Sequence, residues 1–344
     1  MTDTRKVRWG VIGATARIAK DAVIPAILAC ENAQLTAVAS RSRERAREIA
    51  GNAGPDVAAY GDYDSLIADD AVDAIYLPLP NNLHLGWAVE AMNNGKHVLC
   101  EKPLALNANE AEEMRETAEA NGVLLSEAFM YCYHPLQTEV EALVRRGTLG
   151  EVRLVRASFS FVQTESDDYR RDPGMGGGAL FDVGCYCLHI ARRAFGTEPT
   201  VVTAKSLFDP VVGIDTTTIA LMEFQGGGMA LIDCSFSLSQ RAAYEIVGSE
   251  GSLGVPRFLL GGQAAGTGME AGEYCLSQNG QDTVHHSRPG NMYVGEIEAL
   301  SCRILGEDVF YLPPEDAVGN MRLLDAVALS ARSGQKVTVE RVTI

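Results

Sequence analysis

The stretch that decides the fold is residues 7–19, VRWGVIGATARIA, near the start of the 344-residue chain. Residues 7–12 form a short apolar run, which predicts a buried strand. Gly13 follows, and from Ala16 a helical pattern begins that is interrupted at Pro25. A strand, a glycine turn and a helix in this order bring unpaired N–H groups and a favourable helix dipole to the turn. The stretch therefore predicts the first unit of a fold that binds a dinucleotide.

The glycine turn is irregular as a phosphate-binding motif. The usual pattern is G-x-G-x-x-G, and counting from Gly13 puts Thr15 at the second glycine. On the motif alone, an ordinary tight turn fits equally well. We expect the following turn residues to contact the cofactor: Gly13, Thr15, Ala16, Arg17 and Ile18.

Strands and helices alternate through the first third of the chain. Strands are expected at 34–39, 72–77, 96–100 and 123–126, and helices at 42–50, 63–68, 83–93 and 107–122. Asn107 and Glu110 have the spacing of a capping box. This alternation predicts a parallel sheet covered on both faces, ending near residue 128.

The pattern changes after residue 128. Strands are expected at 151–161, 200–207, 214–224, 228–238, 243–248, 273–278 and 336–342, and helices at 136–145, 178–195, 291–306 and 314–333. Strands that neighbour one another in sequence favour an antiparallel or mixed sheet. The chain therefore divides into an α/β domain, 1–128, and a second domain, 129–344.

Composition excludes several classes of protein. A net charge of −16 argues against a nucleic-acid surface. The acidity suits either a salt-tolerant host or simply a soluble surface. No apolar run reaches the ~18 residues of a membrane span, and the polar start predicts no signal peptide. Eight cysteines without a CxxC pair predict no metal site and a reducing compartment, the cytoplasm.

The end of the second expected strand bears on cofactor choice. An NAD enzyme usually places Asp or Glu here, but this chain reads Ala39-Ser40-Arg41-Ser42. Ser40 and the Arg41 guanidinium could instead bind a 2′-phosphate, which favours NADP and leaves NAD possible. The alternative is a solvated basic helix start.

Lys102 follows the strand at 96–100 and precedes Pro103. Ligands gather at the C-terminal ends of parallel strands, so Lys102 could lie beside the nicotinamide, with a cis bond to Pro103 fixing its direction. A surface lysine before a turn is the alternative. His84, after another strand end, is a candidate for the cofactor cleft.

Residues 176–189, GGGALFDVGCYCLH, carry a second group of candidates. Asp182, Tyr186 and His189 fall at i, i+4 and i+7, which places them on one helix face. Tyr186 could accept or donate a proton, and a nearby Lys102 would lower its pKa. The alternative is a packing tyrosine beside a core histidine.

Together, these motifs resemble those of the glucose–fructose oxidoreductase/inositol dehydrogenase (Gfo/Idh/MocA) family. The resemblance is carried by RWGVIG (8–13), LPLPNNLH (77–84), CEKPL (100–104), EAFMYCYHP (127–135) and residues 176–186, in the family's order. The tyrosine in the last motif is most similar to the branch of NADP-dependent dihydrodiol and D-xylose dehydrogenases and glucose–fructose oxidoreductase. NADPH-dependent ketosugar reductases share it.

The resemblance implies a Rossmann domain followed by a domain with an open, mostly antiparallel sheet that often pairs subunits, giving a homodimer or homotetramer. It also implies that Lys102 orients substrate and cofactor, that Tyr186 exchanges the proton, and that Asp182 holds a sugar hydroxyl, with His189 a further substrate contact. Further cofactor contacts are implied at Leu79, Pro80, Asn81, His84 and Glu101. Two departures from the family are the glycine turn and Cys132, where many relatives carry a basic residue.

The sequence thus predicts hydride transfer between NADP(H) and a sugar or polyol, with Tyr186 as acid and base. Residues 162–175 are expected to border the substrate. Two alternatives remain at this point: a reductase of nucleotide-linked ketosugars, and a non-catalytic dinucleotide sensor, because fold alone does not give function.

Overall fold

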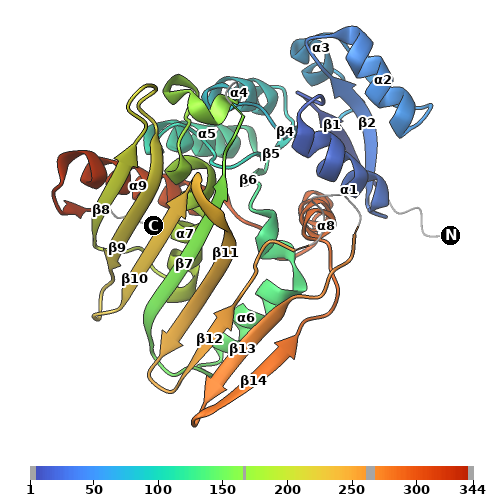
Figure 1. Ribbon diagram of the computed structural model, residues 1–344. Coiled ribbons are helices and arrows are strands. Elements are labelled where there is room, and N and C mark those ends of the chain that lie inside the picture. The colour runs from blue at the N-terminus through green and yellow to red at the C-terminus, as the bar shows by residue number, and fades with distance from the viewer. Residues whose placement is uncertain (1–4, 166–167, 261–267, 340–344) are drawn as a thin grey trace.

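A computed structural model describes residues 5–165, 168–260 and 268–339 (Figure 1). The first of its two sheets has six parallel strands in the order β3-β2-β1-β4-β5-β6. This is the strand order of a dinucleotide-binding Rossmann fold. The α/β class predicted for the first part of the chain is confirmed.

The strands of this sheet are β1 (Val7–Val11), β2 (Ala33–Ala39), β3 (Ala58–Tyr60), β4 (Ala74–Leu77), β5 (His97–Cys100) and β6 (Leu125–Glu127). Its helices are α1 (Ile24–Ala29), α2 (Arg43–Ala53), α3 (Tyr63–Ile67), α4 (His84–Asn93) and α5 (Ala108–Asn121). Strand β3 was not expected from the sequence. Pro25 lies at the start of α1, after a π-helical turn at Ala19–Val23, so the helix widens before the proline rather than stopping there.

The second sheet has nine strands in the order β14-β13-β12-β11-β7-β10-β9-β8-β15. Among the strands of the described residues, β7 and β10 form the one parallel pair, so the sheet is mostly antiparallel, as the resemblance implies. Its strands are β7 (Val152–Val162), β8 (Val201–Phe208), β9 (Asp215–Glu223), β10 (Met229–Ser235), β11 (Ser237–Gly248), β12 (Gly251–Val255), β13 (Glu273–Gln278), β14 (Gln281–His286) and β15 (Val337–Thr338).

Three details of the second sheet differ from the sequence expectation. The chain turns into β11 at residue 237, so the strand expected at 228–238 ends earlier and the one expected at 243–248 begins earlier. Strands β12 and β14 were missed because glycines and polar residues weaken their apolar pattern. The strand expected at 336–342 is the two-residue β15, and its last three residues lie outside the described residues.

The large sheet has one covered and one open face (Figure 1). Helices α6 (Pro135–Arg145), α7 (Cys185–Phe195) and α9 (Pro314–Ser333) lie behind it in this view. The inner face buries apolar side chains against these helices. The outer face exposes large apolar side chains at Leu207, Ile219, Leu221, Met229 and Leu231.

The end of the chain returns to the first sheet. Helix α8 (Met292–Ile304) packs against α1, and α9 packs against α5. The buried Trp9 indole of β1 donates a hydrogen bond of 3.0 Å to the Ser301 hydroxyl of α8. Helices from the end of the chain therefore pack against the first domain and join the two domains.

Candidate active site

A cleft of about 710 Å³ runs along the C-terminal ends of β1, β2 and β4. Of the expected cofactor residues, it is lined by Gly13, Thr15, Ala16, Arg41, Leu79 and Pro80. Residues that were not among the expected cofactor contacts also line it: Gly61, Asp62, Tyr63, Asp64, Pro78, Asn82, Leu83, Trp87 and Met175. Several of these follow β3, and recognising that short strand would have placed them at the same sheet edge. We call this the cofactor cleft.

The glycine turn is shaped for a close approach to the cleft. Gly13 has φ +67°, a conformation that L side chains rarely adopt, and a Cβ there would lie 2.6 Å from a Leu79 methyl carbon. The Ala14 and Ala16 N–H groups bond within the turn or to β2. The Thr15 N–H donates no hydrogen bond among the described residues. Thr15 thus offers a main-chain donor to the cleft although it replaces a glycine.

The remaining turn residues lie differently. Ile18 is half-buried, and the Arg17 side chain is 85% exposed and pairs with Asp21. Neither residue lines the cofactor cleft as described. The structure therefore brings only part of the expected turn to the cleft.

Ser40 and Arg41 differ in their exposure and in their contacts. Ser40 is buried, and its hydroxyl accepts a hydrogen bond of 3.2 Å from the Ser42 N–H, which shapes the turn into α2. Arg41 is exposed and lines the cofactor cleft. Only Arg41 is thus positioned to meet a ligand directly in this conformation.

His84 lies behind the cleft wall rather than on it. Its ring is wholly buried, with Nε2 2.8 Å from the Leu79 carbonyl and Nδ1 3.1 Å from the Pro103 carbonyl. It therefore joins the wall at Leu79 to the loop that follows Lys102. Any support it gives a cofactor is indirect.

Lys102 lies at the end of β5 and points across to the second domain. Its Nζ donates hydrogen bonds of 2.8 Å to the Asp182 carbonyl and 2.9 Å to Asp182 Oδ1. The Lys102–Pro103 peptide bond is cis. On the other side of Asp182, Oδ2 accepts a bond of 2.8 Å from Arg170 Nε. We call Lys102, Arg170 and Asp182 the front cluster.

Two cations on one carboxylate fix its charge. Burial would raise the pKa of Asp182, but Lys102 and Arg170 more than offset it and hold the pKa at about 2. Asp182 is therefore ionised at neutral pH. Lys102 stays charged for the matching reason, because Asp182 offsets the cost of burying the ammonium and raises its pKa.

Arg170 belongs to a segment that we call the strap, residues 168–178. Arg170 lies within residues 162–175, which were expected to border the substrate, but the sequence did not point to this residue in particular. The Asn81 amide donates a bond of 3.0 Å to the Gly176 carbonyl, which ties the strap to the first domain. A Cβ on Gly177 would lie only 2.5 Å from the Arg170 carbonyl oxygen. The glycine run therefore lets the strap fold closely enough to bring Arg170 to Asp182.

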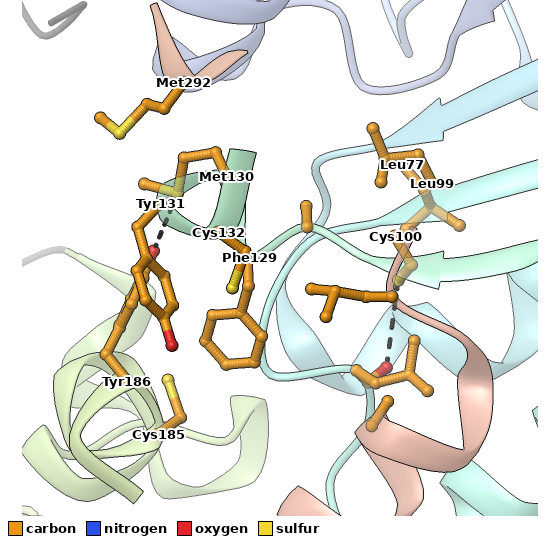
Figure 2. Packing of buried hydrophobic residues seen from close by; sticks show 14 of the residues in the cluster. Leu77, Leu99, Cys100, Phe129, Met130, Tyr131, Cys132, Cys185, Tyr186 and Met292 are labelled. Atoms are coloured by element: carbon orange, nitrogen blue, oxygen red, sulfur yellow. Dashed lines mark hydrogen bonds between the residues drawn. The ribbon is translucent and has the colours of Figure 1, made fainter. Parts of the chain in front are cut away.

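Tyr186 is the first polar side chain after Asp182 on the same face. It is 3% exposed, and its hydroxyl donates a weak bond of 3.4 Å to the Met130 sulfur (Figure 2). The ring packs edge-on against Phe129, with centroids 5.0 Å apart. Lys102 Nζ lies 5.2 Å from the centre of the Tyr186 ring.

The expectation that Lys102 lowers the pKa of Tyr186 is wrong for this structure. Burial raises the pKa of the phenol well above 10, and Glu101 adds to the effect. The ammonium faces the ring rather than the hydroxyl, and its charge is already engaged by Asp182. The Tyr186 phenol is therefore neutral in this structure.

Glu101 contacts the residues on either side of it in the site, Tyr76 and Lys102. Its Oε1 accepts a bond of 2.6 Å from the Tyr76 hydroxyl, and its Oε2 accepts one of 3.2 Å from the Lys102 N–H. Burial raises its pKa. In this arrangement the carboxylate positions Lys102 and does not line the cofactor cleft as described.

His189 does not face the front cluster. Its ring is wholly buried, with Nδ1 2.8 Å from the Tyr131 hydroxyl and Nε2 2.6 Å from Asp316 Oδ2. Burial lowers the pKa of the imidazole, so Nε2–H donates to Asp316 and Nδ1 accepts from Tyr131. Asp316 Oδ1 also accepts from Arg192 at 3.2 Å. Both ring nitrogens of His189 are thus engaged within the protein, and neither is left for a substrate. We call His189, Arg192 and Asp316 the rear cluster.

Within the described ranges, no group of His, Cys, Asp and Glu could hold a metal ion. The same ranges contain no helix with the length and apolar character to cross a bilayer. All eight cysteines are free thiols, Cys132 among them, and Cys132 is buried.

Family models match both parts of the chain. The model of the Gfo/Idh/MocA oxidoreductase family with its NAD-binding Rossmann fold matches residues 7–129, and that of a Gfo/Idh/MocA C-terminal domain matches 138–254. The chain belongs to the Gfo/Idh/MocA family. It is thus an NAD(P)-dependent oxidoreductase, and the resemblance seen in the sequence is confirmed.

Known members of this family share most of the chain's length. A D-xylose 1-dehydrogenase (NADP⁺) of Haloferax volcanii is 36% identical over 96% of this chain and 99% of its own. A dTDP-3,4-didehydro-2,6-dideoxy-α-D-glucose 3-reductase of Streptomyces violaceoruber is 39% identical over 74% and 73%. The structure of the 3-ketoreductase KijD10 of Actinomadura kijaniata, with NADP and TDP-benzene, matches with a TM-score of 0.86 at 29% identity, covering 95% and 98%.

Proposed function

We propose that this oxidoreductase transfers hydride between NADP(H) and a carbon of a sugar or polyol, with Tyr186 as proton donor and acceptor. The observation that carries the proposal is the arrangement of Lys102 and Asp182 beside Tyr186, with 2.9 Å between the ion pair and 5.2 Å from the ammonium to the ring. The dehydrogenase and ketoreductase relatives support it through their names.

The cofactor cleft suits NADP. The unpaired Thr15 N–H and the tight Gly13 turn fit a pyrophosphate, and Arg41 lines the same cleft beside the short Ser40 turn. A guanidinium at this position can bind a 2′-phosphate with charge-assisted bonds. When bound, NADP⁺ takes up the hydride that leaves the carbinol carbon, and NADPH supplies it in the reverse direction.

The chain's own groups would handle the proton. In reduction, the neutral Tyr186 phenol gives its proton to the carbonyl oxygen that becomes the hydroxyl. In oxidation, the phenolate takes the hydroxyl proton. Lys102, fixed by Asp182, lies 5.2 Å from the centre of the Tyr186 ring and would orient the substrate and the cofactor beside the phenol.

Asp182 can bind a substrate hydroxyl without losing its cations. A carboxylate has about four acceptor positions, and Lys102 and Arg170 occupy one on each oxygen. The remaining positions can accept a sugar hydroxyl. Arg170 also retains unused donors next to the site, which suits a polyhydroxylated substrate.

A reductase of nucleotide-linked ketosugars is the second candidate. The raised pKa of Tyr186 favours it, because a tyrosine that holds its proton is ready for reduction. The relative from Streptomyces violaceoruber carries such a name, and KijD10 is named a 3-ketoreductase and was solved with TDP-benzene. The two candidates differ in substrate and direction but use the same residues.

We further propose a cytoplasmic homo-oligomer paired through the open face of the large sheet. Leu207 and Ile219 are 63% and 51% exposed there, and Leu231 lies on the neighbouring strand β10. An apolar face of this kind marks an interaction site. Light scattering on the purified protein should give a mass above the 36.9 kDa of one chain, and Leu231→Glu should reduce it to one chain.

A spectrophotometric screen tests the function. The enzyme is incubated with NADP(H) or NAD(H) and D-xylose, D-glucose, myo-inositol, an aromatic dihydrodiol or a dTDP-linked ketosugar, in both directions. We expect turnover with NADP(H) and at least one free sugar or polyol. Turnover only with the dTDP-ketosugar would favour the reductase, and turnover with none of them would contradict both candidates.

A further inference from the structure

A second cavity of about 550 Å³ lies at the C-terminal half of α7, between α6 and the inner face of β11. Its volume falls within the range of small-molecule pockets. Its described lining shares no residue with the front cluster or the cofactor cleft. We call it the rear cavity.

A buried amide facing the rear cavity lacks a partner. Gln137 of α6 is 4% exposed and lines the cavity. Its Oε1 accepts a bond of 2.9 Å from the Tyr244 hydroxyl, while Nε2 has no partner among the described residues. Turning the amide round would satisfy Nε2 and leave the oxygen unpaired. In either orientation one polar atom is unsatisfied, which is rare for a buried group.

The charges around the rear cavity are balanced. Three guanidinium groups and three carboxylates line it: Arg145, Arg192, Arg193, Glu141, Glu198 and Asp316. They form ion pairs across its wall, with 2.6 Å between Arg192 and Glu198 and 2.6 Å between Arg193 and Glu141. A balanced lining gives no net attraction to an ion, so it favours a neutral ligand.

These ion pairs retain hydrogen-bonding capacity. Arg192 donates three bonds, to Glu198 and Asp316, of the five that a guanidinium can donate. Glu141 receives both Arg193 bonds on Oε1. Spare donors beside spare acceptors suit hydroxyl groups, because a hydroxyl both donates and accepts.

One wall of the rear cavity is apolar. It is formed by Val140, Val144, Ile190 and Ile246, beside the Tyr244 ring. A sugar or cyclitol presents C–H groups on one face of its ring and hydroxyls at the edge. The combination of an apolar wall with paired charges and an unsatisfied amide matches both features.

We propose that the rear cavity binds a neutral polyhydroxy compound, a sugar or polyol, at a site separate from the catalytic one. The bound molecule would lie one aromatic layer behind Tyr186. Tyr131 lines the cavity, and its ring centre is 5.9 Å from that of Tyr186. The Gln137 amide would bond one of the ligand's hydroxyls.

Methyl NMR tests the proposal at the site itself. The full chain, saturated with NADP, is labelled with ¹³C at the isoleucine δ-methyl groups and titrated with D-xylose, myo-inositol or glycerol. We expect saturable shifts at Ile190 and Ile246, which line the cavity, and none at Ile75, which is buried in β4. The readout does not depend on turnover, so it can succeed or fail independently of the proposed function.

Variants at the amide provide the matched comparison. Gln137→Leu combined with Tyr244→Phe removes the amide that would bond the ligand, together with the Tyr244 hydroxyl that bonds that amide. This double variant should weaken polyol binding about tenfold. Tyr244→Phe alone keeps the amide and should bind as well as the unaltered protein. If the double variant fails to fold, Ala194→Trp, at the half-exposed edge of the cavity, should block binding instead.

The possible outcomes separate clearly. Saturable shifts at Ile190 and Ile246 that the double variant or Ala194→Trp loses would support the proposal. Shifts with sodium benzoate but with none of the polyols would overturn the neutral class. No shift at either methyl with any polyol, up to the highest soluble concentration, would overturn the site.

Discussion

The front cluster and the rear cluster flank the same helix, α7, and each centres on a carboxylate, which is buried at Asp182 and partly exposed at Asp316. In the front cluster, Asp182 lies between Lys102 and Arg170, and the ammonium is 5.2 Å from the Tyr186 ring. In the rear cluster, Asp316 lies between His189 and Arg192.

The two clusters differ in how they reach Tyr186. The front cluster touches the tyrosine ring directly. The rear cluster reaches it through Phe129, which stacks on His189 at 4.3 Å and meets Tyr186 edge-on at 5.0 Å. The comparison teaches that similar ion-paired carboxylates can serve two purposes. We expect the front cluster to act mainly on the reaction and the rear cluster mainly on stability.

The largest expected effect is that of Tyr186→Phe on turnover. Losing general acid–base help typically costs ~10²- to 10⁴-fold in rate. Among the described residues, the phenol hydroxyl makes one hydrogen bond, a weak one to the Met130 sulfur, so the free energy of unfolding should change little. Steady-state kinetics and urea unfolding measure the two quantities. Turnover within threefold of the unaltered enzyme would contradict the role given to Tyr186.

The next effect tests the rear cluster. Asp316→Ala removes the acceptor of both His189 and Arg192 and leaves a buried cation with one partner fewer, so it should lower the free energy of unfolding by about 3 kcal/mol. The folded enzyme should keep its kcat within tenfold. Urea unfolding and kinetics on the same preparation measure both.

Asp308→Ala is the matched control for Asp316→Ala. Asp308 is a fully exposed partner of Arg303, and its loss should leave the free energy of unfolding unchanged within the error of the measurement. A large loss of kcat with unchanged stability in Asp316→Ala would reverse the comparison between the clusters.

A variant at the cofactor cleft sharpens the comparison, because it lies outside both clusters. Arg41→Ala removes a charge-assisted contact to the 2′-phosphate and should raise KM for NADP about tenfold. KM for NAD should stay nearly constant, since NAD lacks that phosphate. Equal changes with both cofactors would contradict the assignment of Arg41.

The smallest effect is a pH dependence of stability from the front cluster. The pKa of Asp182 is about 2 in the folded protein against about 3.9 unfolded, so its contribution is present above pH 4 and is lost as the pH falls toward 2. Between pH 5 and pH 3 the unaltered protein should lose about 1 kcal/mol from this group. In Asp182→Asn that share of the pH dependence should disappear, as urea unfolding at both pH values would show.

The first domain could be predicted from the sequence almost completely. Its parallel strands are buried on both faces, so each is a short apolar run, and helices separate them at regular intervals. Only β3 was not predicted, because its three residues, Ala58–Tyr60, are too few to show the apolar pattern of a strand. In the second domain, β12 was missed because Gly251 and Gly254 interrupt its apolar pattern. Strand β14 was missed because it is an edge strand whose residues are mostly exposed and polar.

Gly13 adopts the tight conformation expected of the glycine turn, and the expected cofactor contacts Thr15 and Arg41 line the same cleft. The sequence by itself determined the Rossmann fold, the end of β5 at which Lys102 lies, and the pairing of Asp182 with Tyr186 on one face, because these depend on local periodicity and strand ends. Only the tertiary structure decided what those groups meet.

Arg170 reaches Asp182 because the strap folds on its glycines, and His189 turns to Asp316 from a helix 127 residues further along the chain. The pKa of Tyr186 rises because an apolar shell from several segments surrounds it. Burial and long-range pairing depend on which segments meet in space, and local sequence does not carry that information.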